Sequence, residues 1–413
     1  MSVPSSTDSG EKTALPVRGK QLFLSVGDHS ASIHATRVIS KLRQLEPGID
    51  IWGMGSQRME DAGMRVEVNF ENYSTFGIAN VIKHLPRLAA LRKALVDLIA
   101  ERKPDAVLLI DYGGFHLSLA KMIKERLPNM QIIFLISPQV WGSRPWRAKT
   151  IGKVIDRMLV IFPFEETWYK ARGIPARFVG HPLASQFDSI DYQKKREQIC
   201  EKYHLDPTKP LVGVFPGSRK REIEDNVPPA MQAISWLCRD LPNVQFVISQ
   251  ANDKFSERLT ELIIKYGPRS GSQLKVAHVG DSSDLMAAAD IVWAKSGTTT
   301  LEAGLMKKPM LIFYRADWPS YLLVLLFKRV RWIGLPNLLT GGVVPELFQL
   351  DCRAELFVKY TRDWLEVPGA RQSTVEKLGK IHEQLGSTKF DDVAAQEILA
   401  VINGAEAGAK TTV

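Results

Sequence analysis

Short apolar runs of strand length alternate along the chain with amphipathic segments of helix length. In the first half the apolar runs lie at residues 21–26, 106–110, 131–136 and 157–162. Between them, segments 31–45 and 81–102 carry apolar residues three and four positions apart, with Lys and Arg on the other face, as helices that cover a sheet do. This alternation predicts an α/β fold with a parallel, doubly wound sheet.

The alternation pauses in a polar, charged stretch at residues 186–210 and then starts again. The new apolar runs lie at residues 211–215, 245–249, 274–279, 290–294 and 309–314. We therefore predict two tandem Rossmann-like domains with a cleft between them. The predicted division is a disordered lead-in at 1–18, a first domain at 19–185, a linker at 186–210, a second domain at 211–365, and a C-terminal helix and tail at 366–413. Ligands of such sheets bind at the carboxyl ends of the strands, so the loops after the strands are the candidate sites.

Composition narrows the classes of partner. The chain has 54 Lys and Arg against 45 Asp and Glu, a net charge of +9, which favours an anionic partner such as a phosphate, a membrane surface or nucleic acid. No P-loop or base-reading motif occurs, so nucleic acid is not an expected partner. The apolar run at 321–327 is far shorter than the roughly 20 residues that cross a bilayer. Membrane contact is therefore expected to be peripheral.

The cysteines carry no metal or disulfide signal. Cys200, Cys238 and Cys352 lie far apart and form no Cys-x-x-Cys pair. An odd number of isolated cysteines is typical of reduced thiols in a cytoplasmic protein. Neither a disulfide framework nor a zinc site is predicted.

Two loops of the first domain place polar residues directly after a strand. The loop 25–32, SVGDHSAS, opens into a helix, and a helix start attracts phosphate or sugar hydroxyls. Small residues after a strand also mark any tight turn. Asp111 leaves an apolar strand ahead of Gly113 and Gly114, where a carboxylate can act as a general base. The alternative, which spacing alone favours, is an Asp that caps the next helix.

The first loop of the second domain combines a Pro-Gly turn with a hydroxyl and a cation. In FPGSRKREIE, Ser218 and Arg219 precede a helix, and Arg219 could hold a diphosphate and offset the charge of a leaving group. Lys220 and Arg221 are interpreted as a solvated basic face.

The loop WAKSGTTTLEAG is the most informative one. Ser296, Gly297 and Thr298 stand at a helix start, where hydroxyls and N–H groups suit phosphate oxygens. Glu302, further along that helix, could bind both hydroxyls of a ribose. A ligand-free Ser/Thr N-cap followed by an acidic residue would have the same pattern.

Nine motifs, taken in order, resemble the lipid-A-disaccharide synthase family, which are inverting GT-B glycosyltransferases. They lie at residues 27–34, 53–59, 108–115, 136–141, 162–165, 178–184, 215–219, 296–304 and 335–347. The resemblance extends from about Gln21 to Leu350. It implies transfer from UDP-2,3-diacylglucosamine to 2,3-diacylglucosamine 1-phosphate through a β-1,6 linkage, with release of UDP and with no metal or other cofactor.

The resemblance also assigns roles to residues. Asp111 corresponds to the essential carboxylate and Asp28 stands at the position of a family Glu, so these two are the predicted catalytic residues. The predicted UDP-sugar-binding residues are Ser218, Arg219, Ser296, Gly297, Thr298, Glu302, Asn337 and Glu346. The predicted acceptor and membrane patch comprises Phe76, Ile78, Val81, Ile82 and Leu85. A free-standing amphipathic helix is the alternative account of the patch.

The first domain departs from the family pattern in two places. Ala31 and Ser32 stand where the family has Gly and Asp, and Gly114 replaces the second carboxylate of the turn after Asp111. The donor loops match the family, so the donor is predicted more firmly than the acceptor. Two other hypotheses stay open, a relative of the same fold that acts on another UDP-sugar and a non-catalytic sugar-nucleotide-binding membrane protein.

The expected partners follow from the resemblance and the charge. They are a UDP-diacylglucosamine donor, an acylated glucosamine 1-phosphate acceptor and an anionic membrane surface. The expected location is the cytoplasm, at the inner face of the cytoplasmic membrane. The sequence leaves the oligomeric state open, and a homodimer is compatible with it.

Overall fold

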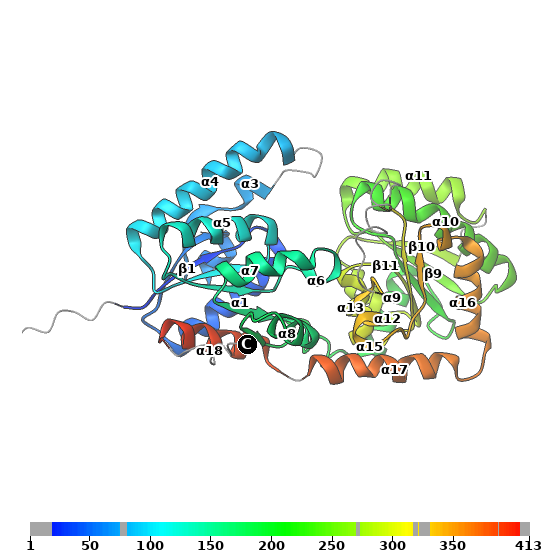
Figure 1. The fold of residues 1–413 in the computed structure, drawn as a ribbon. Helices are drawn as coiled ribbons and strands as arrows, with labels where there is room; N and C mark the ends of the chain where they lie inside the picture. The colour runs from blue at the N-terminus through cyan, green and yellow to red at the C-terminus, as the bar shows by residue number, and fades with distance from the viewer. Residues whose placement is uncertain are drawn as a thin grey trace, which may run out of the picture.

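The chain forms two parallel β-sheets, one in each half (Figure 1). The computed structural model describes residues 19–74, 81–269, 273–316, 321, 331–386 and 388–404. The first sheet has the order β3-β2-β1-β4-β5-β6-β7. Its strands are β1 (Gln21–Ser25), β2 (Asp50–Gly55), β3 (Arg65–Asn69), β4 (Ala106–Ile110), β5 (Gln131–Leu135), β6 (Arg157–Val160) and β7 (Ala176–Phe178). The prediction of an α/β fold with two Rossmann-like domains is confirmed.

The second sheet has the order β10-β9-β8-β11-β12-β13. Its strands are β8 (Leu211–Phe215), β9 (Gln245–Ser249), β10 (Leu274–Ala277), β11 (Ile291–Lys295), β12 (Met310–Tyr314) and β13 (Glu346–Phe348). Every residue of β4, β8 and β9 is buried, because helices cover both faces of these central strands. All the predicted apolar runs except 274–279 form inner strands of the two sheets. That run forms the edge strand β10, and β2 is an inner strand that the predicted runs did not include.

Helices cover the first sheet on both faces. Figure 1 shows α4 and α5 above it and α1 with α18 below it. The helices of this half are α1 (His29–Leu45), α2 (Gln57–Asp61), α3 (Glu71–Ser74), α4 (Val81–Arg102), α5 (Gly113–Arg126), α6 (Val140–Ser143), α7 (Ala148–Val154) and α8 (Pro163–Lys170). The two helices expected at 31–45 and 81–102 correspond to α1 and α4.

The second half has its own set of helices. They are α9 (Tyr192–Tyr203), α10 (Lys220–Asp240), α11 (Ser256–Tyr266), α12 (Ser282–Ala288), α13 (Thr298–Leu305), α15 (Leu335–Thr340), α16 (Ala354–Glu366) and α17 (Ala370–Leu385). Helix α9 lies in the stretch predicted as a linker. Its Ile199 and Tyr203, four residues apart, are buried in the second-domain core, so one face of this polar stretch is anchored.

The end of the chain returns to the first domain. In Figure 1, α17 runs along the second domain and α18 (Phe390–Ile402) lies under the first sheet. Phe390, Ala394 and Ile398 belong to the first-domain core. An ion pair between Arg37 of α1 and Asp391 of α18, 2.8 Å long, joins the same two helices. The C-terminal segment that contains α18 therefore packs against the first domain.

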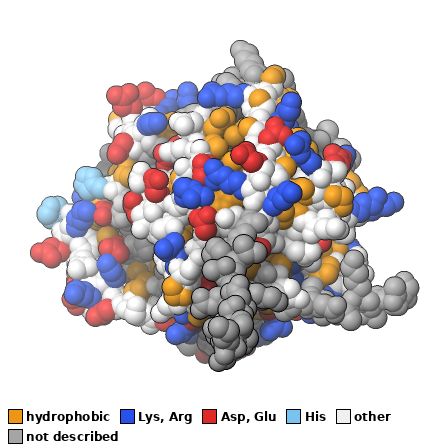
Figure 2. Space-filling view, turned by 90° about the vertical axis from the view of Figure 1, so that its left-hand side faces the viewer, with side chains coloured by type: hydrophobic (Ala, Val, Ile, Leu, Met, Phe, Trp, Pro, Cys, Tyr) orange, Lys and Arg blue, Asp and Glu red, His pale blue; other side chains and the backbone are white. Residues whose placement is uncertain are grey.

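Charges of both signs are mixed on the end of the molecule seen in Figure 2, where basic and acidic side chains alternate with apolar ones. On that face the Lys and Arg side chains do not form one continuous basic patch. Within the described ranges, no helix combines the length and the apolar character that crossing a membrane requires.

Candidate functional site

Two loops of the second domain meet in one cavity of about 290 Å³. Both follow neighbouring parallel strands, β8 and β11, so their carboxyl ends lie at the same edge of the sheet. The cavity brings together six predicted donor residues. They are Ser218, Arg219, Ser296, Gly297, Thr298 and Glu302.

Glu222, in the first turn of α10, holds these loops together. Its Oε2 accepts hydrogen bonds from the backbone N–H groups of Ser218 and Arg219, at 3.0 and 3.4 Å. Its Oε1 pairs with the Lys295 ammonium at 3.0 Å. A Cβ on Gly217 would lie 2.5 Å from Oε2, so only glycine allows this approach. The ion pair joins the end of β11 to the start of α10.

Arg219 stays available to a ligand. Its guanidinium lies 3.7 Å from Glu222 Oε1, and its side chain is 73% exposed. Lys295, also in the cavity lining, is a second cation that the sequence interpretation overlooked, although it stands next to the Ser-Gly pair of the motif. Two cations and a helix start facing one cavity suit a diphosphate.

Helix α13 begins without a side-chain cap, since its N-cap is Gly297, whose φ is 155°. The Thr300 hydroxyl bonds to the Gly297 carbonyl at 2.7 Å and leaves the first N–H groups of the helix open to a ligand. The Ser/Thr cap that would explain the motif without a ligand is therefore not formed. Burial raises the pKa of Glu302, and no described residue hydrogen-bonds its carboxylate.

Asn337 and Glu346 do not line this cavity. The Asn337 amide donates to Val344 O at 2.7 Å and to Glu346 Oε1 at 2.9 Å, and its oxygen accepts two backbone N–H groups. Glu346 accepts from the backbone of Ile333 and Gly334. Both side chains hold α15 and β13 together, and their contact with the donor stays a prediction.

In the first domain, strained backbone gathers at the carboxyl edge of the sheet. Asp111 and Tyr112, after β4, have φ of 50° and 52°, and Ile136, after the neighbouring β5, has φ of 63°. Each such residue costs about 1–2 kcal/mol, and a β-branched one is a clear outlier. Strained backbone of this kind is found mainly at active sites and ligand-binding sites.

Asp111 does not cap the following helix. The N-cap of α5 is Tyr112, and it makes no side-chain capping bond. Burial, and after it the negative charge of Asp28, raise the pKa of Asp111, while a hydrogen bond from the Tyr112 backbone N–H lowers it. Asp28 does cap α1, by accepting from Ala31 N at 2.8 Å through Oδ1. The negative charge of one predicted catalytic carboxylate, Asp28, therefore acts on the other, Asp111.

Glu165 is a buried carboxylate that the sequence interpretation did not single out, although it ends the FPFE motif. Its Oε1 accepts from Ser137 Oγ at 2.7 Å and Trp141 Nε1 at 2.9 Å, and its Oε2 accepts from Phe162 N at 3.2 Å. Burial raises its pKa to about 7 despite these bonds. It joins the loop after β5 to the start of α8.

We expect Glu165→Gln to change how stability depends on pH. A carboxyl whose pKa is about 7 when folded binds its proton more tightly than the unfolded chain does, so the native protein loses stability as pH rises from 5 to 8. The glutamine variant lacks this titration. Relative to the glutamine variant, the native protein should therefore lose about 2 kcal/mol of unfolding free energy between pH 5 and pH 8. Denaturant unfolding at pH 5 and pH 8 measures it, and a constant difference would contradict it.

Four of the five predicted patch residues lie outside the described side chains. Phe76 and Ile78 lie outside the described residues, and of Val81 and Ile82 only the backbone, in α4, is described. The Leu85 side chain is 49% exposed. The patch stays a prediction.

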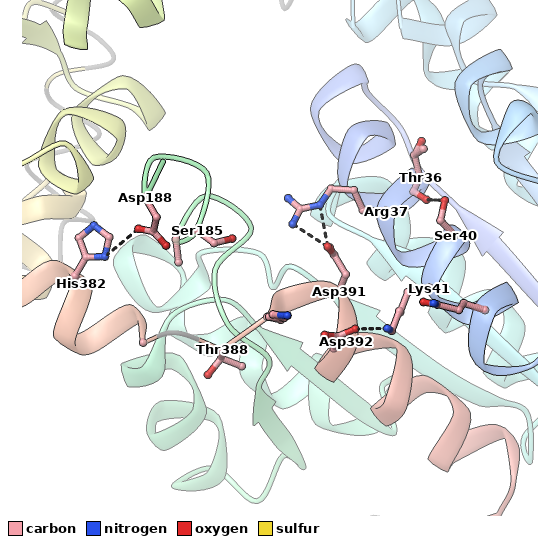
Figure 3. Close-up of a pocket in the computed structure, with 14 residues that line it drawn as sticks. Thr36, Arg37, Ser40, Lys41, Ser185, Asp188, His382, Thr388, Asp391 and Asp392 are labelled. Carbon is pink, nitrogen blue, oxygen red and sulfur yellow. Dashed lines mark hydrogen bonds and ion pairs between the residues drawn. The ribbon is translucent and has the colours of Figure 1, made fainter. Parts of the chain in front are cut away.

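A larger cavity, of about 760 Å³, lies where the chain crosses back to the first domain. Figure 3 shows Arg37 and Lys41 of α1 turned toward Asp391 and Asp392 of α18, with His382 and Asp188 across the cavity. None of the predicted catalytic or donor residues lines it. Size therefore does not mark the reaction site. Among the described residues, no group of three or more His, Cys, Asp and Glu side chains could hold a metal.

Comparison with known proteins relates the chain to one family of sequences. The family described as lipid-A-disaccharide synthetase matches residues 22–397. A lipid-A-disaccharide synthase of Anaeromyxobacter sp. (strain K) is 34% identical over 92% of this chain and 97% of its own. The corresponding enzyme of Coxiella burnetii is 33% identical over 93% and 98%.

Solved structures with the same arrangement are much more distant in sequence. The UDP-GlcNAc 2-epimerase of Neisseria meningitidis bound to UDP-GlcNAc has a TM-score of 0.59 at 12% identity, covering 92% of this chain and 98% of that one. A glycosyltransferase of Rickettsia africae has a TM-score of 0.58 at 11% identity, covering 95% and 100%. At these identities the likeness concerns the fold.

Proposed function

The chain belongs to the lipid-A-disaccharide synthase family, and we propose that it joins UDP-2,3-diacylglucosamine to 2,3-diacylglucosamine 1-phosphate. It is thus a glycosyltransferase of lipid A biosynthesis. The observation that carries the proposal is the family match over residues 22–397, which includes both donor loops and the turn at Asp111.

In the proposed reaction the acceptor 6-hydroxyl attacks the anomeric carbon of the donor on the face opposite UDP. The new C–O bond forms as the bond from the anomeric carbon to the diphosphate oxygen breaks, and UDP leaves with that electron pair. Asp111 takes the hydroxyl proton. Arg219, Lys295 and the N–H groups at the start of α13 offset the charge that develops on the diphosphate.

Glu302 and Asp28 have supporting parts in this proposal. The buried carboxylate of Glu302, in the donor cavity, is proposed to bind the ribose hydroxyls. Asp28 is proposed to accept a hydrogen bond from a sugar hydroxyl. Contact with an anionic membrane at the cytoplasmic face is proposed from the net charge of +9 and the exposed Leu85.

The test is a UDP-release assay with the purified protein, UDP-2,3-diacylglucosamine and 2,3-diacylglucosamine 1-phosphate. We expect one UDP for each disaccharide 1-phosphate formed, and no UDP when the acceptor is omitted. UDP release only with another acylated acceptor would show that the acceptor assignment is wrong. Tight UDP binding without turnover on any acylated acceptor would contradict catalysis altogether.

A further inference from the structure

The turn after β4 contains two consecutive non-glycine residues in the left-handed region. Asp111 has φ of 50° and Tyr112 has φ of 52°. Residues with a Cβ rarely adopt this conformation, and two in succession persist only where neighbouring groups hold them. The contacts of this turn therefore indicate what keeps Asp111 in place.

One contact comes from His116, in the first turns of α5. Its Nδ1 lies 2.7 Å from the Asp111 carbonyl oxygen, and its Nε2 lies 2.9 Å from Ser25 Oγ. A carbonyl oxygen only accepts, so Nδ1 carries the proton. Nε2 is then the acceptor, and the Ser25 hydroxyl donates to it.

The imidazole is fixed in this role by its surroundings. His116 is 0% exposed, and burial lowers its pKa to about 4, so the ring is neutral and has one donor and one acceptor. The rings of Phe115 and Phe134 pack edge-to-face against it, with centroids 5.7 and 6.1 Å away. Both ring nitrogens are used, and the ring cannot turn without breaking both bonds.

The two bonds connect separate parts of the first-domain site. Ser25 is the last residue of β1, and the loop that follows it leads directly to Asp28. Asp111 follows β4, the neighbour of β1 in the sheet. Through one imidazole, the backbone of the Asp111 turn is tied to the strand end that carries Asp28.

We propose that His116 is a positioning residue, which holds the Asp111 carbonyl in the left-handed turn and thereby keeps the Asp111 carboxylate in its place. This inference rests on the proposed function, in which Asp111 is the base. His116 does not touch the substrate in this arrangement, because its ring is buried and both nitrogens are bonded within the protein.

Two variants separate the two bonds. In His116→Asn the side-chain N–H₂ has the same number of bonds from the backbone as Nδ1, so it can donate to the Asp111 carbonyl while contact with Ser25 is lost. In His116→Gln the amide matches the position of Nε2, so it can reach Ser25 and not the carbonyl. Each variant removes one bond and keeps the other.

We expect the asparagine variant to keep kcat within about threefold of the native value and the glutamine variant to lose about tenfold to a hundredfold, since small displacements of a catalytic group have effects of this size. The donor KM should stay the same in both, because the donor loops lie in the other domain. Steady-state kinetics at saturating acceptor measure this split, and UDP binding and thermal unfolding show whether each variant is folded.

Equal kcat in the asparagine and glutamine variants, whether high or low, would overturn the proposal, because it would mean that the bond to the Asp111 carbonyl is not what matters. If the proposed function itself is wrong, the native protein will release no UDP with the two lipid substrates. The two failures are therefore distinguishable in one set of assays.

Discussion

Replacing Asp111 by asparagine is expected to lower kcat for disaccharide formation about a thousandfold, because a positioned general base contributes roughly 10²–10⁴ to a rate. Asparagine keeps the shape of the side chain and still tolerates the left-handed backbone of this turn. It removes the proton acceptor alone. The measurement is UDP release at saturating donor and acceptor, with UDP affinity determined on the same preparation.

UDP affinity should not change in this variant, because the donor cavity is built from second-domain residues. The matched control is Asp105→Asn, at the opposite end of the same strand, where the carboxylate accepts a hydrogen bond from Gln21 N at 2.7 Å. That variant should turn over like the native protein. Undiminished turnover of Asp111→Asn would remove this carboxylate from the mechanism.

The second large effect is expected from Arg219→Ala, which should lower kcat/KM about a hundredfold or more. The exposed guanidinium lies at the rim of the donor cavity and can bond to two oxygens of a diphosphate. UDP affinity should fall about tenfold to a hundredfold, as a charged hydrogen bond of roughly 1.5–3 kcal/mol implies. Calorimetric titration with UDP and with UMP measures the loss.

The comparison of nucleotides makes this prediction specific. If Arg219 binds the β-phosphate, UMP affinity should change little, because UMP lacks that group. Lys220→Ala, which removes the neighbouring exposed cation, is the control and should bind UDP like the native protein. An equal loss of UMP and UDP affinity in Arg219→Ala would show that the side chain supports the loop and not the diphosphate.

Most inner strands of both sheets were predictable because burial on two faces requires continuous apolar runs, and such runs are visible in the sequence. The inner strand β2 was not predicted, since Gly53 and Gly55 interrupt its apolar run. Of the edge strands, β10 was predicted, whereas β3, β7 and β13 were not. Strand β3 has only half-buried and exposed positions, and β7 and β13 have three residues each. Helix α9 was hidden for a related reason, because only one of its faces meets the core and the rest is charged.

The donor loops were also predictable, since each is one continuous segment whose strand, turn and helix start can be recognised locally. The contact that joins the two loops could not be predicted. The pair of Lys295 and Glu222 depends on β8 and β11 being neighbours, although about 80 residues of sequence lie between their loops. Asn337 and Glu346 show a second kind of difference between sequence and structure. A motif predicted that they bind the donor, but in the structure their side chains bond to each other and to backbone groups.

The sequence by itself determined that this chain forms two parallel α/β domains, that it matches a family of UDP-sugar transferases, and that Asp111, Arg219 and the Ser296 loop belong to strand ends. Only the tertiary structure decided which strand ends are neighbours. It placed Ser25 against His116, 91 residues away, and it returned α18 to the first domain. The physical reason is that hydrophobic periodicity is a local property, whereas strand order and the positioning of catalytic groups arise from contacts between distant segments.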